Sequence, residues 1–169
     1  MSRSAPENPR SINHSTRSFL RFFNNTERKV DVIWLNYEGQ NVKFKTLSPG
    51  GFVDVNTYVT HPWIFIDSET KDRLVVKSGQ VFLPEPWYTR YLGLPRNQLQ
   101  QTQIQRTHVF ITIPLFSLRQ RALQIVRNNL VNPEDAYKLE IPKELQNELA
   151  KLIKESNETP FGIVYEEGW

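Results

Sequence analysis

A hydroxyl, an imidazole and an indole ring come close together in one short stretch of this 169-residue chain. Thr57 and His61 supply the polar groups, and Trp63 follows directly after. Trp34 and Phe44 lie on segments that we predict to be neighbouring strands. Apolar walls with a few convergent polar groups are typical of a ligand pocket. A lone histidine would favour the alternative, a core imidazole bonded to a backbone carbonyl, but Thr57 and the two tryptophans favour a pocket.

The sequence carries no recognisable catalytic or metal-binding motif. It has no Cys, which excludes disulfides, thiolate zinc sites and a cysteine nucleophile. Its three histidines, His14, His61 and His108, lack metal-ligand spacing. A Gly-rich phosphate loop, H-E-x-x-H and G-x-S-x-G are all missing. We therefore predict a non-enzymatic protein without a cofactor or a metal, and the sequence does not support a hydrolase.

Charge and hydropathy narrow the class of partner. The chain is 38% hydrophobic and 23% charged, which is enough for a packed core. Its net charge is +3, but the basic residues are spread along the chain instead of clustering with exposed aromatics, so nucleic acid is not an expected partner. No apolar run is long enough for a signal peptide or a membrane span, so no membrane partner is expected.

Residues 11–114 have the pattern of an antiparallel β-sandwich. Seven short apolar segments recur at roughly ten-residue spacing, which is typical of such a fold. They are residues 19–23, 30–37, 42–47, 52–58, 63–66, 74–76 and 81–83. The second is so continuously apolar that we predict a central strand covered on both faces. Residues 109–113 form the last strand, and residues 1–10 have the composition of a disordered leader.

Residues 85–106 interrupt the strand pattern. Pro and Gly punctuate the first part, and Gln fills the second. A loop of this length is either functional or a disordered insertion, and we favour an insertion. Trp87, Tyr88 and Tyr91 support the alternative, since exposed aromatics can anchor a partner.

The apolar period changes from two to 3.6 after Ser117, which predicts a small three-helix domain over residues 115–155. Ser117 is a good N-cap for the first helix, and Pro133 and Pro142 mark the starts of the next two. Residues 156–169 form a tail that either returns to the sandwich or stays loose.

The first helix has two apolar sides. One reading is a plain core helix packed on both sides. In the other, Leu123 and Leu130 close the helical core and the second side faces a partner. So small a core is marginal by itself, which favours a partner that covers one face.

Several segments, in this order, resemble the von Hippel-Lindau tumour suppressor family. They are residues 32–39, 46–50, 61–67 and 117–127. The likeness runs from about Arg10 to about Leu152, broken by residues 85–106, and is that of a divergent, invertebrate ortholog. The family is the substrate receptor of a cullin–RING ubiquitin ligase. The resemblance implies a sandwich that binds a prolyl-hydroxylated segment of the hypoxia-inducible factor α subunit, in the cytoplasm and nucleus.

The resemblance also implies roles for individual residues. Thr57 and His61 would hold the hydroxyproline, Trp34 and Trp63 would wall the pocket, and the full substrate-binding set is Asn13, Trp34, Phe44, Val55, Asn56, Thr57, His61 and Trp63. Several positions depart from the family, which has Tyr, Ser, His and Arg where this chain has Phe44, Thr57, Asn56 and Ser15. We expect these changes to alter affinity more than ligand type.

Two short boxes in the helical region complete the resemblance. Ser117, Leu118, Ala122 and Val126 fit the box that binds elongin C, which is paired with elongin B. Ile141, Pro142 and Leu145 fit the box that selects a cullin carrying a RING protein. Two alternatives stay open. One is a ligase adaptor that reads a different or unmodified peptide, and the other is a stand-alone peptide- or carbohydrate-binding sandwich.

Overall fold

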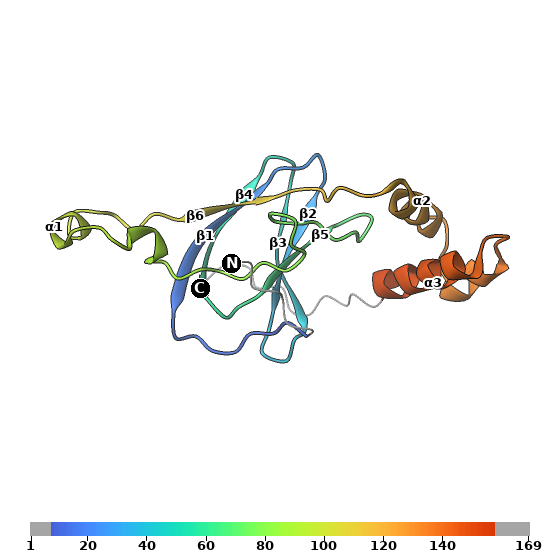
Figure 1. Cartoon of the computed structure of the whole chain (residues 1–169), viewed down its shortest axis with the longest axis horizontal. Coiled ribbons are helices and arrows are strands. Elements are labelled where there is room, and N and C mark those ends of the chain that lie inside the picture. The colour runs from blue at the N-terminus through green and yellow to red at the C-terminus, as the bar shows by residue number, and fades with distance from the viewer. Residues whose placement is uncertain (1–7, 158–169) are drawn as a thin grey trace.

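The computed structural model describes residues 8–157, in which a strand-rich domain is followed by a helical region (Figure 1). Within these residues the strands are β1 (Arg17–Asn24), β2 (Val30–Leu35), β3 (Asn41–Leu47), β4 (Phe52–Tyr58), β5 (Trp63–Asp67) and β6 (Thr107–Ile111). They form two three-stranded sheets, with orders β4-β1-β6 and β3-β2-β5.

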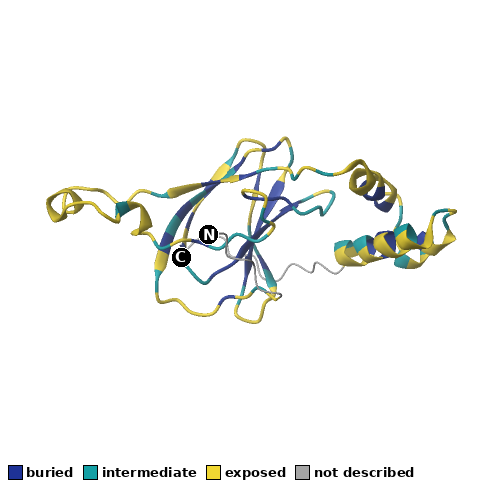
Figure 2. Ribbon diagram, in the orientation of Figure 1, coloured by how far each residue is buried: buried dark blue, intermediate teal, exposed yellow. Residues whose placement is uncertain are grey.

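The two sheets share one hydrophobic core (Figure 2). Side chains alternate between buried and more exposed along β1 and β4, as expected for strands with one covered face. Every residue of β2 and β5 is buried. The side chains on their other face form a second apolar cluster, against which Val81 packs: Ile33, Leu35, Ile64 and Ile66. The prediction that residues 30–37 contain a central strand is therefore confirmed, since β2 lies between β3 and β5.

The sequence predicted seven strands and then a last one, all antiparallel, and this prediction is wrong in two respects. Residues 8–157 form six strands, because residues 74–76 and 81–83 make only isolated bridges such as Trp63 with Phe82. In addition, β6 pairs in parallel with β1. A parallel partner needs a long crossover connection, and residues 25–106, which include β2 to β5, lie between β1 and β6.

Residues 85–106 extend from the domain as an arm (Figure 1). The arm contains two short helical turns, η1 (Thr89–Tyr91) and α1 (Arg96–Leu99), where the sequence predicted an unstructured insertion. Both ends of the arm are held by β-strand backbone. The Trp87 amide donates to the Arg17 carbonyl at 3.1 Å, and Arg106 Nη1 donates to the Leu20 carbonyl at 3.2 Å.

The helical region comprises α2 (Leu118–Arg127), the 3₁₀ helix η2 (Pro133–Lys138) and α3 (Lys143–Asn157). Ser117 caps α2, as predicted: its hydroxyl accepts from the Gln120 amide at 3.2 Å, and the Gln120 side chain accepts from the Ser117 amide at 2.9 Å. The second predicted helix is a 3₁₀ helix of only six residues, which begins at Pro133 and ends before the extended backbone of Leu139. The buried core of this region is small: Leu123, Ala136, Leu149, Ala150 and Ile153.

One buried ion pair joins the helices to the strand-rich domain. Arg127, at the end of α2, places Nη1 2.7 Å from an Asp72 carboxylate oxygen. Its Nη2 donates to the Thr70 carbonyl at 2.9 Å. Both side chains of the ion pair are largely buried, so losing either partner would leave an uncompensated charge in a dry contact.

Phe22 is expected to be a major determinant of stability. Its ring is fully buried and lies 5.3 Å from Trp63, 5.1 Å from Phe65 and 5.8 Å from Phe82, measured between ring centroids. Phe22→Ala should lower the free energy of unfolding by about 3–5 kcal/mol, because it removes apolar contacts and leaves a cavity. Chemical denaturation measures the change. Phe110→Ala, at a half-exposed position, is the control and should cost less than about 1.5 kcal/mol. Equal losses in the two variants would contradict the assignment.

Candidate functional site

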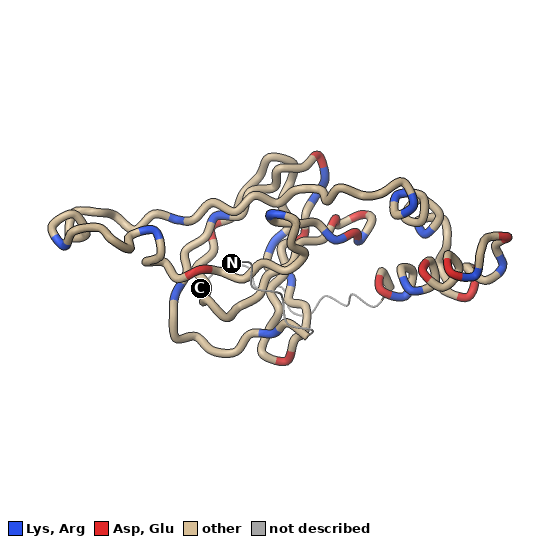
Figure 3. The backbone as a smooth tube through the Cα atoms, in the orientation of Figure 1, with Lys and Arg blue, Asp and Glu red and all other residues tan. Residues whose placement is uncertain are grey.

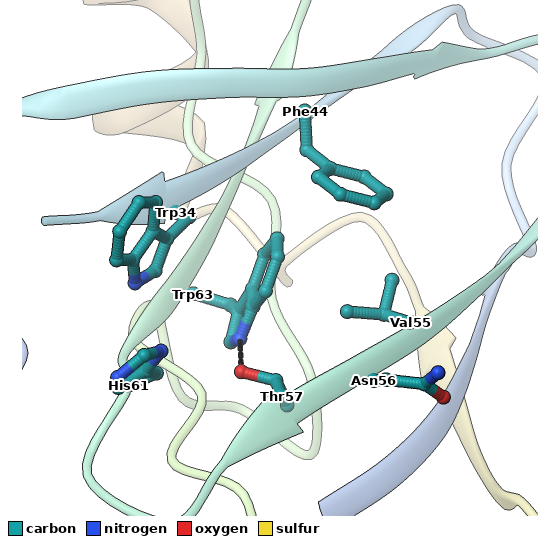
Figure 4. A pocket seen from close by; sticks show the side chains of 7 residues that line it. All are labelled: Trp34, Phe44, Val55, Asn56, Thr57, His61 and Trp63. Atoms are coloured by element: carbon teal, nitrogen blue, oxygen red, sulfur yellow. Dashed lines mark hydrogen bonds between the residues drawn. The ribbon is translucent and has the colours of Figure 1, made fainter. Parts of the chain in front are cut away.

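The candidate site is a pocket whose walls come from both sheets (Figure 4). Trp34, Phe44 and Trp63 reach it from β2, β3 and β5, and β4 supplies the opposite wall. The lining residues are Trp34, Phe44, Val55, Asn56, Thr57, His61 and Trp63. The structure therefore brings together every predicted substrate-binding residue except Asn13.

Strand register explains this convergence. Trp34 and Trp63 are direct partners in the antiparallel pairing of β2 with β5, so their indole rings come from adjacent positions. On β4, alternation buries Val55 and Thr57 and leaves Asn56 exposed. His61 follows in the turn after β4, where its amide donates to the Tyr58 carbonyl at 3.0 Å.

The Thr57 hydroxyl is held in place by an indole. Trp63 Nε1 donates to Thr57 Oγ1 at 3.2 Å, and both residues are buried (Figure 4). That bond uses one lone pair of the hydroxyl oxygen, which keeps its proton and a second lone pair. Thr57 can therefore bond to a ligand while its own position is fixed.

His61 is enclosed by aromatic rings. It is only 2% exposed, and its ring stacks on Trp34 with centroids 5.3 Å apart. The Tyr37 hydroxyl lies 3.2 Å from His61 Nε2. Burial lowers the pKa of His61, His14 lowers it further, and a backbone hydrogen bond with Asn13 opposes the shift. A neutral imidazole offers one donor and one acceptor, which suits a hydroxyl ligand.

Asn13 supports the pocket from outside. Its amide donates to Thr60 Oγ1 at 3.0 Å, and the Thr60 hydroxyl donates to the Asn13 carbonyl at 2.8 Å. The Asn13 side-chain oxygen accepts from the Ser15 amide at 3.2 Å. The structure thus places Asn13 beside the turn that carries His61, not in the lining of the pocket.

Sequence reasoning missed two residues that hold the pocket walls. Trp34 Nε1 donates to Ser11 Oγ at 2.7 Å, and this hydroxyl donates to the Leu35 carbonyl at 2.6 Å. Tyr37 is the second, through its contact with His61. Ser11 had no sequence signal, since it follows a leader-like segment. Tyr37 lies within one of the recognised motifs but carried no expected role.

Phe44 forms a wholly apolar part of the wall. Its ring meets Trp63 edge-on, with centroids 5.5 Å apart and an interplanar angle of 86°. The ring packs well there, but it offers no hydroxyl to a ligand backbone. This side of the pocket therefore contributes shape and apolar contact.

A second candidate surface lies on α2. Leu118 is 91% exposed and Val126 is 37% exposed, and Ala122 is exposed between them. We call these three residues the α2 surface. Leu123, on the other side of the helix, is buried in the helical core, and Leu130 packs against that core. The helix therefore has one side in the core and one open side, which confirms the division predicted from the sequence.

The three residues of the second box differ in exposure. Pro142 is exposed directly before α3, whereas Ile141 and Leu145 are partly buried and pack against the helical core. Ile141 and Leu145 therefore hold the start of α3 against the helical core.

Among residues 8–157, no group of three or more His, Asp or Glu side chains is arranged to hold a metal ion. In the same part of the chain, no helix combines the length and apolarity needed to cross a membrane.

The structure thus offers two separate candidate interaction sites, a pocket between two sheets and an open helix surface, as expected for a binding protein. Comparison with known proteins agrees: residues 9–90 match the VHL beta domain and residues 116–152 match the VHL box domain. Protein Vhl of Drosophila melanogaster is 30% identical over 142 residues, which are 80% of this chain and 77% of that protein. The chain belongs to the von Hippel-Lindau (VHL) family, as the sequence motifs predicted.

The depressed pKa of His61 predicts a pH dependence of stability. The unfolded imidazole titrates near its ordinary pKa of about 6.5, and the buried one titrates lower, so the unfolded state binds more protons as pH falls below about 6.5. The free energy of unfolding should therefore fall from pH 7.5 to pH 5.5, and less steeply in His61→Gln. Urea denaturation at both pH values tests this. His108→Gln, at an exposed position of β6, controls for the loss of a histidine as such. Identical pH dependence in wild type and His61→Gln would refute the prediction.

Proposed function

We propose that this chain is the substrate-recognition subunit of an elongin BC–cullin–RING ubiquitin ligase. Its pocket would bind a prolyl-hydroxylated segment of the hypoxia-inducible factor α subunit, which is then ubiquitinated and degraded. One observation carries the proposal: Thr57 and His61 converge in an aromatic-walled pocket of a chain that has both a VHL beta domain and a VHL box domain.

The chemistry of the pocket suits a hydroxylated ring. The pyrrolidine ring would lie against Trp34 and Trp63, and its hydroxyl would bond to Thr57 and His61. Unmodified proline would displace water from both polar groups and return no hydrogen bond. Sites of this kind reject the analogue that lacks the hydroxyl by roughly 10⁴-fold or more. A single oxygen atom on the substrate can therefore act as the signal for degradation.

The flanks of the substrate peptide would contact Val55 and Asn56 on β4, beside Asn13. Phe44 supplies no hydroxyl to the peptide backbone, and the methyl group of Thr57 must also fit beside the ring. These features tune affinity, whereas Thr57 and His61 decide ligand type.

On the helical side, we propose that the α2 surface binds elongin C, which brings elongin B. Leu118 is nearly fully exposed at the first turn, where the Ser117 cap fixes the start of the helix. Burying one such leucine side chain contributes about 1.5–3 kcal/mol. The start of α3, with Ile141, Pro142 and Leu145, would meet the cullin that carries the RING protein. Such a complex would work in the cytoplasm and nucleus.

The hydroxyproline proposal predicts a large difference between two peptides. Wild-type protein should bind the hydroxylated segment of hypoxia-inducible factor α several orders of magnitude more tightly than the unmodified one. His61→Ala should bring the two affinities close together, because the hydroxyl then loses a partner. Isothermal titration calorimetry gives both affinities, and His108→Ala is the matched control. Equal affinities in the wild type would instead favour an adaptor that reads an unmodified peptide.

The elongin proposal predicts the effect of a charge on the α2 surface. Leu118→Asp should abolish co-purification of the chain with elongins B and C, because a carboxylate would be desolvated in the contact. Val131→Asp makes the same change at an exposed residue outside the box and should leave recovery intact. If the wild type recovers no elongin, the stand-alone binding domain becomes the better reading. If Leu118→Asp recovers as much elongin as the wild type, the contact lies elsewhere.

A further inference from the structure

Tyr37 touches the proposed site from outside the pocket. It follows β2, it is 38% exposed, and it is not one of the residues that line the pocket. Its ring meets Trp34 at 90° and His61 at 88°, with centroids 6.1 and 5.5 Å apart. Its hydroxyl lies 3.2 Å from His61 Nε2. The ring therefore packs against two pocket side chains, and the hydroxyl contacts a single nitrogen of the imidazole.

Which nitrogen the hydroxyl contacts matters, because the two nitrogens of a neutral imidazole differ. One ring nitrogen carries the proton and donates, and the other accepts. Burial lowers the pKa of His61, which favours the neutral form, and a backbone hydrogen bond with Asn13 opposes this shift. In a neutral ring that no partner restrains, both tautomers are open. A partner that engages one nitrogen orients the ring and determines what the other nitrogen offers.

The lining of the pocket identifies the nitrogen that remains. Tyr37 engages Nε2 from outside the lining, whereas the His61 ring itself is part of the lining. Stacking on Trp34 restricts rotation of the imidazole out of its plane. With Nε2 engaged by Tyr37, we expect Nδ1 to be the ring nitrogen offered to a group in the pocket.

We infer that Tyr37 is a positioning residue: its hydroxyl engages Nε2 of His61 and so presents Nδ1, in one tautomer, to the substrate hydroxyl. The inference rests on the proposed function and adds a specificity determinant to it. Tyr37 need not touch the substrate. It lowers the free-energy cost of fixing one ring orientation and one tautomer of His61 when the substrate binds.

The test is Tyr37→Phe in the full-length chain, because this change keeps the ring contacts and removes only the hydroxyl. Affinity for the hydroxylated segment of hypoxia-inducible factor α should fall about 3- to 10-fold, as expected for one lost hydrogen bond. Affinity for the unmodified segment should stay within about twofold, because that peptide makes no bond to His61.

Nitrogen-15 NMR of the histidine side chains provides a readout that needs no peptide. In the wild type, His61 should show one pyrrole-like and one pyridine-like nitrogen. In Tyr37→Phe, the two shifts should move toward each other as both tautomers become populated. A purely structural role for Tyr37 would leave this pattern unchanged.

Tyr58→Phe is the matched control. Tyr58 also packs on His61, with centroids 5.1 Å apart, but within residues 8–157 no hydrogen bond joins its hydroxyl to that ring. It should retain both the affinities and the NMR pattern of the wild type.

The possible failures are distinguishable. If the wild type binds both peptides equally, the hydroxyproline proposal fails, and the NMR comparison still decides the role of Tyr37. If the wild type discriminates but Tyr37→Phe matches it in affinity and in nitrogen shifts, the role of Tyr37 is overturned.

Discussion

The structure depends on one constraint: polar groups buried among aromatic rings must each find a partner. An unpaired buried donor or acceptor costs about 1–3 kcal/mol. The indole N–H of Trp63 is paired with the Thr57 hydroxyl, and that of Trp34 with the Ser11 hydroxyl. The Tyr37 hydroxyl is paired with one nitrogen of His61. These hydrogen bonds pair the polar groups of the walls without a ligand. Thr57 and His61 can each form one further hydrogen bond, which a ligand hydroxyl could use.

The two proposed interaction sites differ in their physical basis. Opposed strands and packed rings form the pocket, and under the proposed function it would select its ligand by hydrogen bonding. The α2 surface is an open apolar patch on a helical region whose own buried core is small. That region is anchored to the strand-rich domain by the buried pair of Arg127 and Asp72. A partner that covers Leu118 would add apolar burial where the helical region is poorest in it.

Membership of the VHL family is carried by both domains, but this chain has features of its own. Matches to the two family domains cover residues 9–90 and 116–152, so most of the arm lies between them. Phe44 makes one wall of the pocket wholly apolar. Tyr37 adds a hydroxyl beside the imidazole. Under the proposed function, Phe44 would shape the pocket and Tyr37 would position His61.

The amino-acid sequence predicted most of the pocket lining, through its resemblance to the family, and the start of α2, through its local pattern. Strand alternation has a period of two, so it decides which side chains face inward, and Ser117 caps its helix through a contact three residues away. The tertiary structure alone decided the parallel pairing of β6, the place of Asn13 and the roles of Ser11 and Tyr37. Those features join positions at least 23 residues apart, such as Ser11 with Trp34. Long-range pairing depends on the path of the whole chain, and no local periodicity records that path.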